Sequence, residues 1–174
     1  MSHRLINSLK RDHVKHRRLL DIFARQIDRV AKVQAPDYDI VEGVIEYFTT
    51  YSLRVHHPKE EMLIAEHHDF HQRIDAFGAQ IRGVLGEGTV MMERDAFTEM
   101  AYDFIDRERR HMSFEDMHLF PAARRHLTAE DWRELEDQIA AEPDFGRRAT
   151  RRYAILRREI LNWEKQNLDG DAAP

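Results

Sequence analysis

The sequence has no cysteine, and it is poor in glycine and proline, with 7 and 5 copies among 174 residues. The absence of cysteine excludes disulfide bonds, iron–sulfur clusters, thiolate zinc sites and cysteine nucleophiles. No apolar run approaches the ~18 residues that a membrane-spanning helix needs, and the first residues contain no apolar signal core. We therefore expect a cytoplasmic protein that makes no contact with a membrane.

The composition favours a single helical domain with added helices. Hydrophobic residues make up 42% of the chain and charged residues 34%, a balance that with little glycine and proline is typical of helical globular proteins. The net charge is −5. Arginines gather at residues 147–152 and 157–158, but in an acidic chain we interpret them as a solvated helix face and expect no nucleic-acid partner.

A helical repeat of apolar residues runs through the first part of the chain. Positions 6, 9, 13, 16, 20, 23, 27 and 30 hold Ile, Leu, His, His, Leu, Phe, Ile and Val. Steps of three and four place them on one stripe of a helix. Two histidines therefore lie in the middle of a stripe that should face the core.

Similar patterns predict the remaining helices. The second spans Asp39 to about Ile64, with Pro58 bending it or loosening one turn. The third and fourth span about 67–85 and 89–120, and a fifth opens at Thr128 with Asp131 as its capping partner. A last helix reaches about Asn167.

The order of these elements predicts an all-α fold, an up-down four-helix bundle with extra C-terminal helices. We expect the bundle over residues 1–127, C-terminal helices packed on it over 128–168, and a disordered tail at 169–174.

Histidine is concentrated in VHHPKEEMLIAEHHDFH, residues 55–71, which holds five of the eleven histidines. His57 with Glu61, His67 with His71, and His111 with Glu115 are each four residues apart, so each pair shares a helix face. With His13 they make five imidazoles and two carboxylates, drawn from four predicted helices.

This donor set predicts a metal site. Imidazole and carboxylate without sulfur suit iron, zinc, manganese, nickel or copper. Seven ligands are too many for one ion, but two ions bridged by Glu61 and Glu115 would use them all. His56 and Glu60 lie a quarter-turn off this face, and we expect them in solvent. His16 and His118 fall on core seams, either as residues that orient ligands or as hydrogen-bonded core residues.

The connection after Glu61 leaves two alternatives open. Only residues 62–66 separate Glu61 from His67. A tight hairpin is one solution; a capping box at Asp69 and Gln72 would then place His67 in the loop and favour His71 as ligand. In the other solution, the second and third helices run on as one rod and a second subunit completes the site. The protein is accordingly expected to be a monomer or a homodimer.

Four segments resemble the hemerythrin-like, HHE cation-binding family. They are LKRDHVKHRRLL (9–20), HHPKEEMLI (56–64), AEHHDFH (65–71) and HMSFEDMHLFP (111–121). The resemblance implies a four-helix bundle around two non-haem iron ions, Fe2+ or Fe3+, with a bridging oxo or hydroxo group. It also implies a small diatomic ligand, dioxygen or nitric oxide.

The resemblance also implies a division of the ligands. His13 and His57 would hold the iron that keeps an open position, and Glu61 and Glu115 would bridge. His67, His71 and His111 would hold the other iron.

Three functions are compatible with such a centre. The excess of imidazole over carboxylate should stabilise the ferrous state, which favours reversible dioxygen or nitric oxide binding, or sensing of these ligands. The alternatives are a di-iron enzyme acting on peroxide or nitric oxide, and an iron-responsive regulatory module. His16, Glu108 and His118 are candidate acids or bases for an enzyme, but the sequence does not give their geometry, so it leaves open whether the protein is an enzyme.

Overall fold

The structure is a computed structural model, which describes residues 4–63, 93–141 and 147–170. Nine helical segments are described: α1 Arg4–Ala31, α2 Tyr38–Tyr47, η1 Phe48–His56, α3 His57–Glu61, α5 Arg94–Phe114, η2 Glu115–Leu119, α6 Phe120–His126, α7 Ala129–Ala141 and α8 Arg147–Gly170. The segments η1 and η2 are π-helical, and the others are α-helical. These residues contain no strand, which confirms the predicted all-α class.

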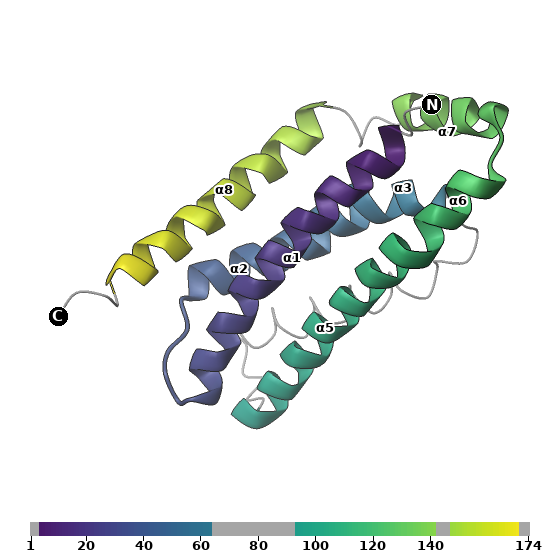
Figure 1. Ribbon diagram of the computed structural model, residues 1–174. Coiled ribbons are helices and arrows are strands. Elements are labelled where there is room, and N and C mark those ends of the chain that lie inside the picture. The colour runs from purple at the N-terminus through teal and green to yellow at the C-terminus, as the bar shows by residue number, and fades with distance from the viewer. Residues whose placement is uncertain (1–3, 64–92, 142–146, 171–174) are drawn as a thin grey trace.

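The long helices lie side by side as a bundle (Figure 1). The segments α2, η1 and α3 follow one another without a break and form one rod. This rod and α5 both run antiparallel to α1 (Figure 1), and α1 packs against both of them. Helix α8 packs on α2 and η1.

Helix α1 supplies the central stripe that the sequence predicted. Val30 is partly buried. The other seven positions are buried: Ile6, Leu9, His13, His16, Leu20, Phe23 and Ile27. The apolar members divide into two clusters. Leu5, Ile6 and Leu9 pack with residues of α6 and α7, whereas the residues from Leu19 onward pack with α2, η1, α5 and α8. His13 and His16 lie between these clusters along α1.

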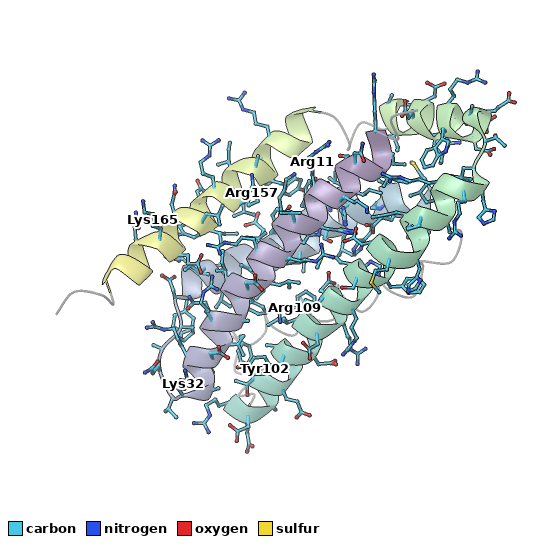
Figure 2. The ribbon with its side chains drawn as sticks, viewed as in Figure 1. Arg11, Lys32, Tyr102, Arg109, Arg157 and Lys165 are labelled. Carbon is cyan, nitrogen blue, oxygen red and sulfur yellow. The ribbon has the colours of Figure 1, made fainter. Side chains whose placement is uncertain are left out.

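Polar bonds along the outer edge join α1 to α5. Arg109 Nη2 donates to Asp21 Oδ1 at 2.7 Å, and the Tyr102 hydroxyl donates to Asp28 Oδ1 (Figure 2). Exposed pairs of this kind contribute only about 0–1 kcal/mol each. The apolar stripe of α1 therefore does most to hold these two helices together.

Prolines explain the two π-helical segments. Pro58 and Pro121 each follow the end of a π-helical segment by two residues. The residue before each proline donates its N–H five residues back, His57 to Ser52 O and Phe120 to Glu115 O. The wider turn provides room for the proline ring, which clashes with the preceding turn of an α-helix. The loosened turn predicted at Pro58 is confirmed. The predicted end at Phe120 is wrong, because the helix passes Pro121 and reaches His126.

The rod ends at Glu61. Met62 and Leu63 form a turn, in which the Leu63 N–H bonds to Glu60 O at 2.8 Å. The connection from residue 64 onward, on which the choice between a hairpin and a continuous rod depends, lies outside the described residues. The predicted third helix at 67–85 lies outside the described residues. The capping box at Thr128 is confirmed, since Thr128 N and Oγ1 both donate to Asp131 Oδ2, at 2.7 and 2.8 Å.

Helix α8 is held by apolar and charged contacts. Ile160 is fully buried in the larger cluster, and the buried Glu164 carboxylate binds Arg18 and Arg25 of α1. The close approach of α8 to α2 depends on Gly43. A Cβ atom there would lie 3.0 Å from Ile160 Cγ1 and 3.3 Å from Trp163 Cζ3. The division of the chain into a bundle and C-terminal helices at residue 127 stays a prediction.

The substitution Gly43→Ala should destabilise the protein. The added methyl group must displace the buried Ile160 side chain, and overpacking of this kind outweighs the better helix propensity of alanine. We expect a loss of about 1 kcal/mol, or about 3 °C in Tm, in thermal unfolding followed by circular dichroism. Glu42→Ala, at the exposed neighbouring position, is the control and should change Tm little. A Gly43→Ala protein as stable as the wild type would contradict the close packing of α8.

Candidate metal site

The buried polar site is built by side chains from three helical stretches. His13 of α1 is fully buried, and its Nε2 lies 3.1 Å from Glu60 Oε1 and 3.3 Å from Glu115 Oε2. Glu60 comes from α3, and Glu115 begins η2. The imidazole of α1 therefore lies between two carboxylates that come from distant parts of the chain.

Two more histidines complete the contacts of these carboxylates. His56 Nε2 lies 2.8 Å from Glu60 Oε1. His111 Nε2 lies 3.4 Å from Glu115 Oε1 and 3.9 Å from Glu60 Oε2. Each carboxylate thus faces histidines from more than one helix.

The donor atoms form two overlapping groups that could each hold a cation. One group is His13, His56 and Glu60, and the other is His57, Glu60 and His111; within each group the donor atoms lie within 4.8 Å of one another. Glu60 belongs to both groups. Glu115 contacts His13 of the first group and His111 of the second. Carboxylates shared in this way are suited to bridge two neighbouring cations.

Two further carboxylates hold the outer edges of the imidazole rings. His13 Nδ1 donates to Asp116 Oδ1 at 3.2 Å, and Arg17 Nη2 donates to Asp116 Oδ2 at 2.7 Å. On the other side, Asp12 Oδ2 lies 3.8 Å from His56 Nδ1. Carboxylates behind metal-binding imidazoles fix the orientation of the ring and raise its basicity. This outer layer leaves Nε2 of both rings facing Glu60.

The π-helical turns set which residues face this site. Val44, Phe48, Ser52, His56 and Glu60 follow at every fourth position, and all are at most 1% exposed. In an α-helix, steps of four drift around the axis by about 40° each. The wider turns of η1 offset that drift and keep every fourth residue on the inner face. His56 and Glu60 are therefore buried in the site, and the prediction that they lie in solvent is wrong.

The two buried carboxylates change the pKa values of the imidazoles around them. Burial lowers the pKa of His13, but hydrogen bonds with Glu115 and Glu60 outweigh it and raise the pKa to about 9. Burial likewise lowers the pKa of His56, but the Glu60 charge and the bonds with Asp12 and Glu60 raise it to about 10.

The two carboxylates respond in opposite directions. Burial and the charge of Glu60 raise the pKa of Glu115. For Glu60, burial acts in the same upward direction, but the His56 charge and the nearby rings of His111, His13 and His56 outweigh it and lower the pKa well below its usual range. Glu60 is thus the carboxylate that stays ionised, and its buried negative charge needs a positive charge nearby.

The donor set fits a divalent cation. Among the described residues, no hydrogen bond reaches Glu60 Oε2, because His111 Nε2 at 3.9 Å is too distant. A buried carboxylate oxygen without a partner is costly, and a cation between Glu60 and the histidines would satisfy it. Imidazole and carboxylate are the ligands that iron and its neighbours in the first transition row accept.

The structure brings together four of the seven predicted ligands. His13, His57, His111 and Glu115 all belong to the site, although their role as ligands stays a prediction. Glu61 is half-buried, and in the described residues the contacts with His13, His56 and His111 belong to Glu60 instead. The predicted ligands His67 and His71 lie outside the described residues.

The other histidines and the missed residues also have clear positions. His118 is exposed, so its predicted place on a core seam is wrong. His16 is buried, with its ring centroid 4.4 Å from that of His56. Burial lowers its pKa well below the usual range and keeps it neutral. Sequence reasoning missed Asp12 and Asp116, which directly adjoin His13 and Glu115 in sequence; that adjacency was the available signal.

The comparison with known families agrees with this geometry. Residues 4–123 match the hemerythrin HHE cation-binding domain family. The match covers more than half of the chain, and the chain belongs to this family, as its motifs had indicated. It is therefore a cation-binding protein of the hemerythrin class. No curated protein and no solved structure matches the chain. No helix among the described residues is long and apolar enough to cross a bilayer.

Metal affinity should rise steeply with pH. His13 and His56 have pKa values of about 9 and about 10 without metal, so a cation must displace their protons at neutral pH. Two displaced protons raise affinity by up to about 100-fold per pH unit below pH 9, and the rise ends above about pH 10. Co2+ affinity at pH 6, 7 and 8, followed by visible absorption, measures this slope. The exposed-site variant His118→Ala should keep the wild-type slope. Equal affinities at pH 6 and pH 8 would show that these imidazoles are not protonated in the metal-free protein.

Proposed function

We propose that the protein holds two non-haem iron ions and binds dioxygen or nitric oxide at them. The observation that carries this proposal is the pair of donor groups that share Glu60, with Glu115 contacting a histidine of each. A single cation would leave one of the two groups unused. Two ferrous ions would supply the two electrons that dioxygen takes up on reversible binding.

The ligands follow the two donor groups. His13 and His56 would serve one ion, and His57 and His111 the other, with Glu60 and Glu115 between them. Glu60 thus takes the bridging role that the sequence analysis gave to Glu61. His67 and His71 remain proposed ligands of the second ion, on the basis of the family resemblance.

The charge of this centre supports ligand binding over oxidation chemistry. Four imidazoles and two carboxylates meet among the described residues. Imidazoles are neutral donors, so the ions keep more positive charge and the ferrous state is favoured. Two divalent ions carry four positive charges, of which Glu60 and Glu115 neutralise two. A bridging oxo or hydroxo group would neutralise the rest in part.

The surroundings of the site favour a small neutral ligand. The ring of Phe120 stacks on His13 with centroids 5.4 Å apart. On the other side, Phe48 lies 5.4 Å from His16 and 5.6 Å from Phe104 between ring centroids. Apolar walls of this kind would disfavour a charged metabolite and suit a diatomic molecule.

A di-iron enzyme acting on peroxide or nitric oxide is the second candidate, and Glu108 is the observation that favours it. This glutamate is 1% exposed. Burial, together with the charges of Glu60 and Glu115, raises its pKa to about 7, although His111 and His56 act against this. A carboxyl that titrates near neutral pH beside the centre could pass protons to a bound substrate.

Anaerobic loading with ferrous iron tests the function. We expect two irons per chain, and a visible absorption band that appears when oxygen is admitted and bleaches when it is removed. Two irons that oxidise without return would support the enzyme, and turnover of peroxide and nitric oxide would then be measured with Glu108→Gln. One iron per chain or none would contradict the two-ion centre.

Glu60→Gln and Glu61→Gln separate the structural and sequence assignments of the bridge. Glutamine keeps the size of the side chain but removes the charge that both donor groups share. We expect Glu60→Gln to lose at least one of the two irons, and Glu61→Gln to keep both, as measured by iron content after desalting. Circular dichroism confirms that each variant is folded. Loss of iron from Glu61→Gln alone would restore the assignment made from the sequence.

A further inference from the structure

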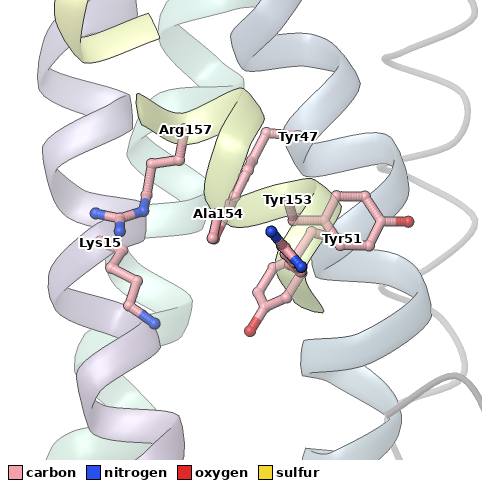
Figure 3. Close-up of a pocket in the computed structure, with 7 residues that line it drawn as sticks. Lys15, Tyr47, Tyr51, Tyr153, Ala154 and Arg157 are labelled. Atoms are coloured by element: carbon pink, nitrogen blue, oxygen red, sulfur yellow. The ribbon is translucent and has the colours of Figure 1, made fainter. Parts of the chain in front are cut away.

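A polar cavity lies between α1, the rod and α8 (Figure 3). Its volume is about 290 Å³. Six of its lining side chains carry polar groups: Lys15 of α1, Tyr47 and Tyr51 of the rod, and Arg151, Tyr153 and Arg157 of α8. None of the proposed iron ligands lines it.

The cavity is positively charged. Three cationic side chains line it, and no acidic side chain does. Lys15 is compensated, because its Nζ donates to the buried carboxylate of Asp12. Within the described part of the chain, Arg151 and Arg157 form no ion pair, whereas the neighbouring Arg152 binds Glu46 at 3.2 Å. Two uncompensated guanidinium charges therefore face the same space.

The tyrosines add hydrogen-bond donors and an aromatic wall. Tyr47 is only 2% exposed, yet among the described residues its hydroxyl has no hydrogen-bond partner. Burial raises the pKa of this hydroxyl well above its ordinary value, so it stays protonated and can donate. Tyr51 donates to Asp12 at 3.0 Å. The Tyr51 ring lies 5.1 Å from those of Tyr47 and Tyr153.

We propose that this cavity binds a small, doubly charged oxyanion of the phosphate type. The two unpaired guanidinium groups match two negative charges. Guanidinium and hydroxyl groups donate to oxyanions with good geometry, and the protonated Tyr47 hydroxyl can serve as one of the donors. The volume suits a ligand smaller than a typical drug molecule. The site does not depend on the proposed iron centre, since it shares no ligand with it.

Titration calorimetry tests the site on the full-length protein, with inorganic phosphate and phenyl phosphate in separate titrations and all variants at equal metal content. We expect saturable binding with one ligand per chain. Arg157→Ala and Arg151→Ala should each weaken it about tenfold or more, because each removes a charged hydrogen-bond donor. Arg158→Ala, an exposed arginine of α8 that does not line the cavity, should change it less than twofold.

The two ligands distinguish a free ion from a ring-bearing molecule. Tighter binding of phenyl phosphate would show that the tyrosine wall holds an organic group, and equal binding would show a site for the phosphate group alone; both results support the proposal. No saturable binding to the wild type, or equal binding to all three variants, would overturn it. Because Arg151 is exposed, its variant should fold even if Arg157→Ala does not.

Discussion

The burial of two carboxylates side by side is the constraint on which the rest of the site depends. Glu60 and Glu115 are at most 1% exposed, and unpaired charges in such a place would cost several kcal/mol each. The helices therefore bring imidazoles to both of them, and His13 lies between the two. Without metal, protons on the imidazoles provide the positive charge. A cation provides the same charge without them, so metal and protons compete for one set of atoms.

The π-helical turns are the backbone device that makes this meeting possible. Pro58 and Pro121 each follow a π-helical segment. His56 ends η1 and His57 comes directly after it, whereas Glu115 begins η2. Wide turns of this kind cost hydrogen-bond geometry and occur mostly at functional sites. Here they rotate successive residues of the rod so that Glu60, and not Glu61, points at His13.

Periodicity explains both the success and the failure of prediction from the sequence. The stripe of α1 could be predicted because α1 is a regular α-helix, and a regular repeat converts directly into a buried face. The same regular repeat applied to the rod paired His57 with Glu61. His57 belongs to the site, but it is Glu60 that contacts His13, because Pro58 signals a loosened turn without revealing how far the π-helical segment extends. His13 was found because α1 is regular, and His111 and Glu115 were found because they precede or begin the irregular segment η2. The outer carboxylates Asp12 and Asp116 were missed because neighbouring residues on a helix point in different directions. Each aspartate instead reaches a histidine of another helix: Asp12 lies near His56, and Asp116 binds His13.

The position of the site between two apolar clusters decides what can reach each polar region. Phe120 lies on one side of the histidines, and Phe48 with Phe104 lies on the other. A charged molecule would lose its hydration there without regaining it, whereas a diatomic gas has little hydration to lose. Ion pairs instead connect the centre to the surface: Asp116 pairs with Arg17, and Asp12 pairs with Lys15. We therefore expect an anion at the outer cavity, where Arg151 and Arg157 form no ion pair within the described part of the chain, and a neutral ligand at the centre.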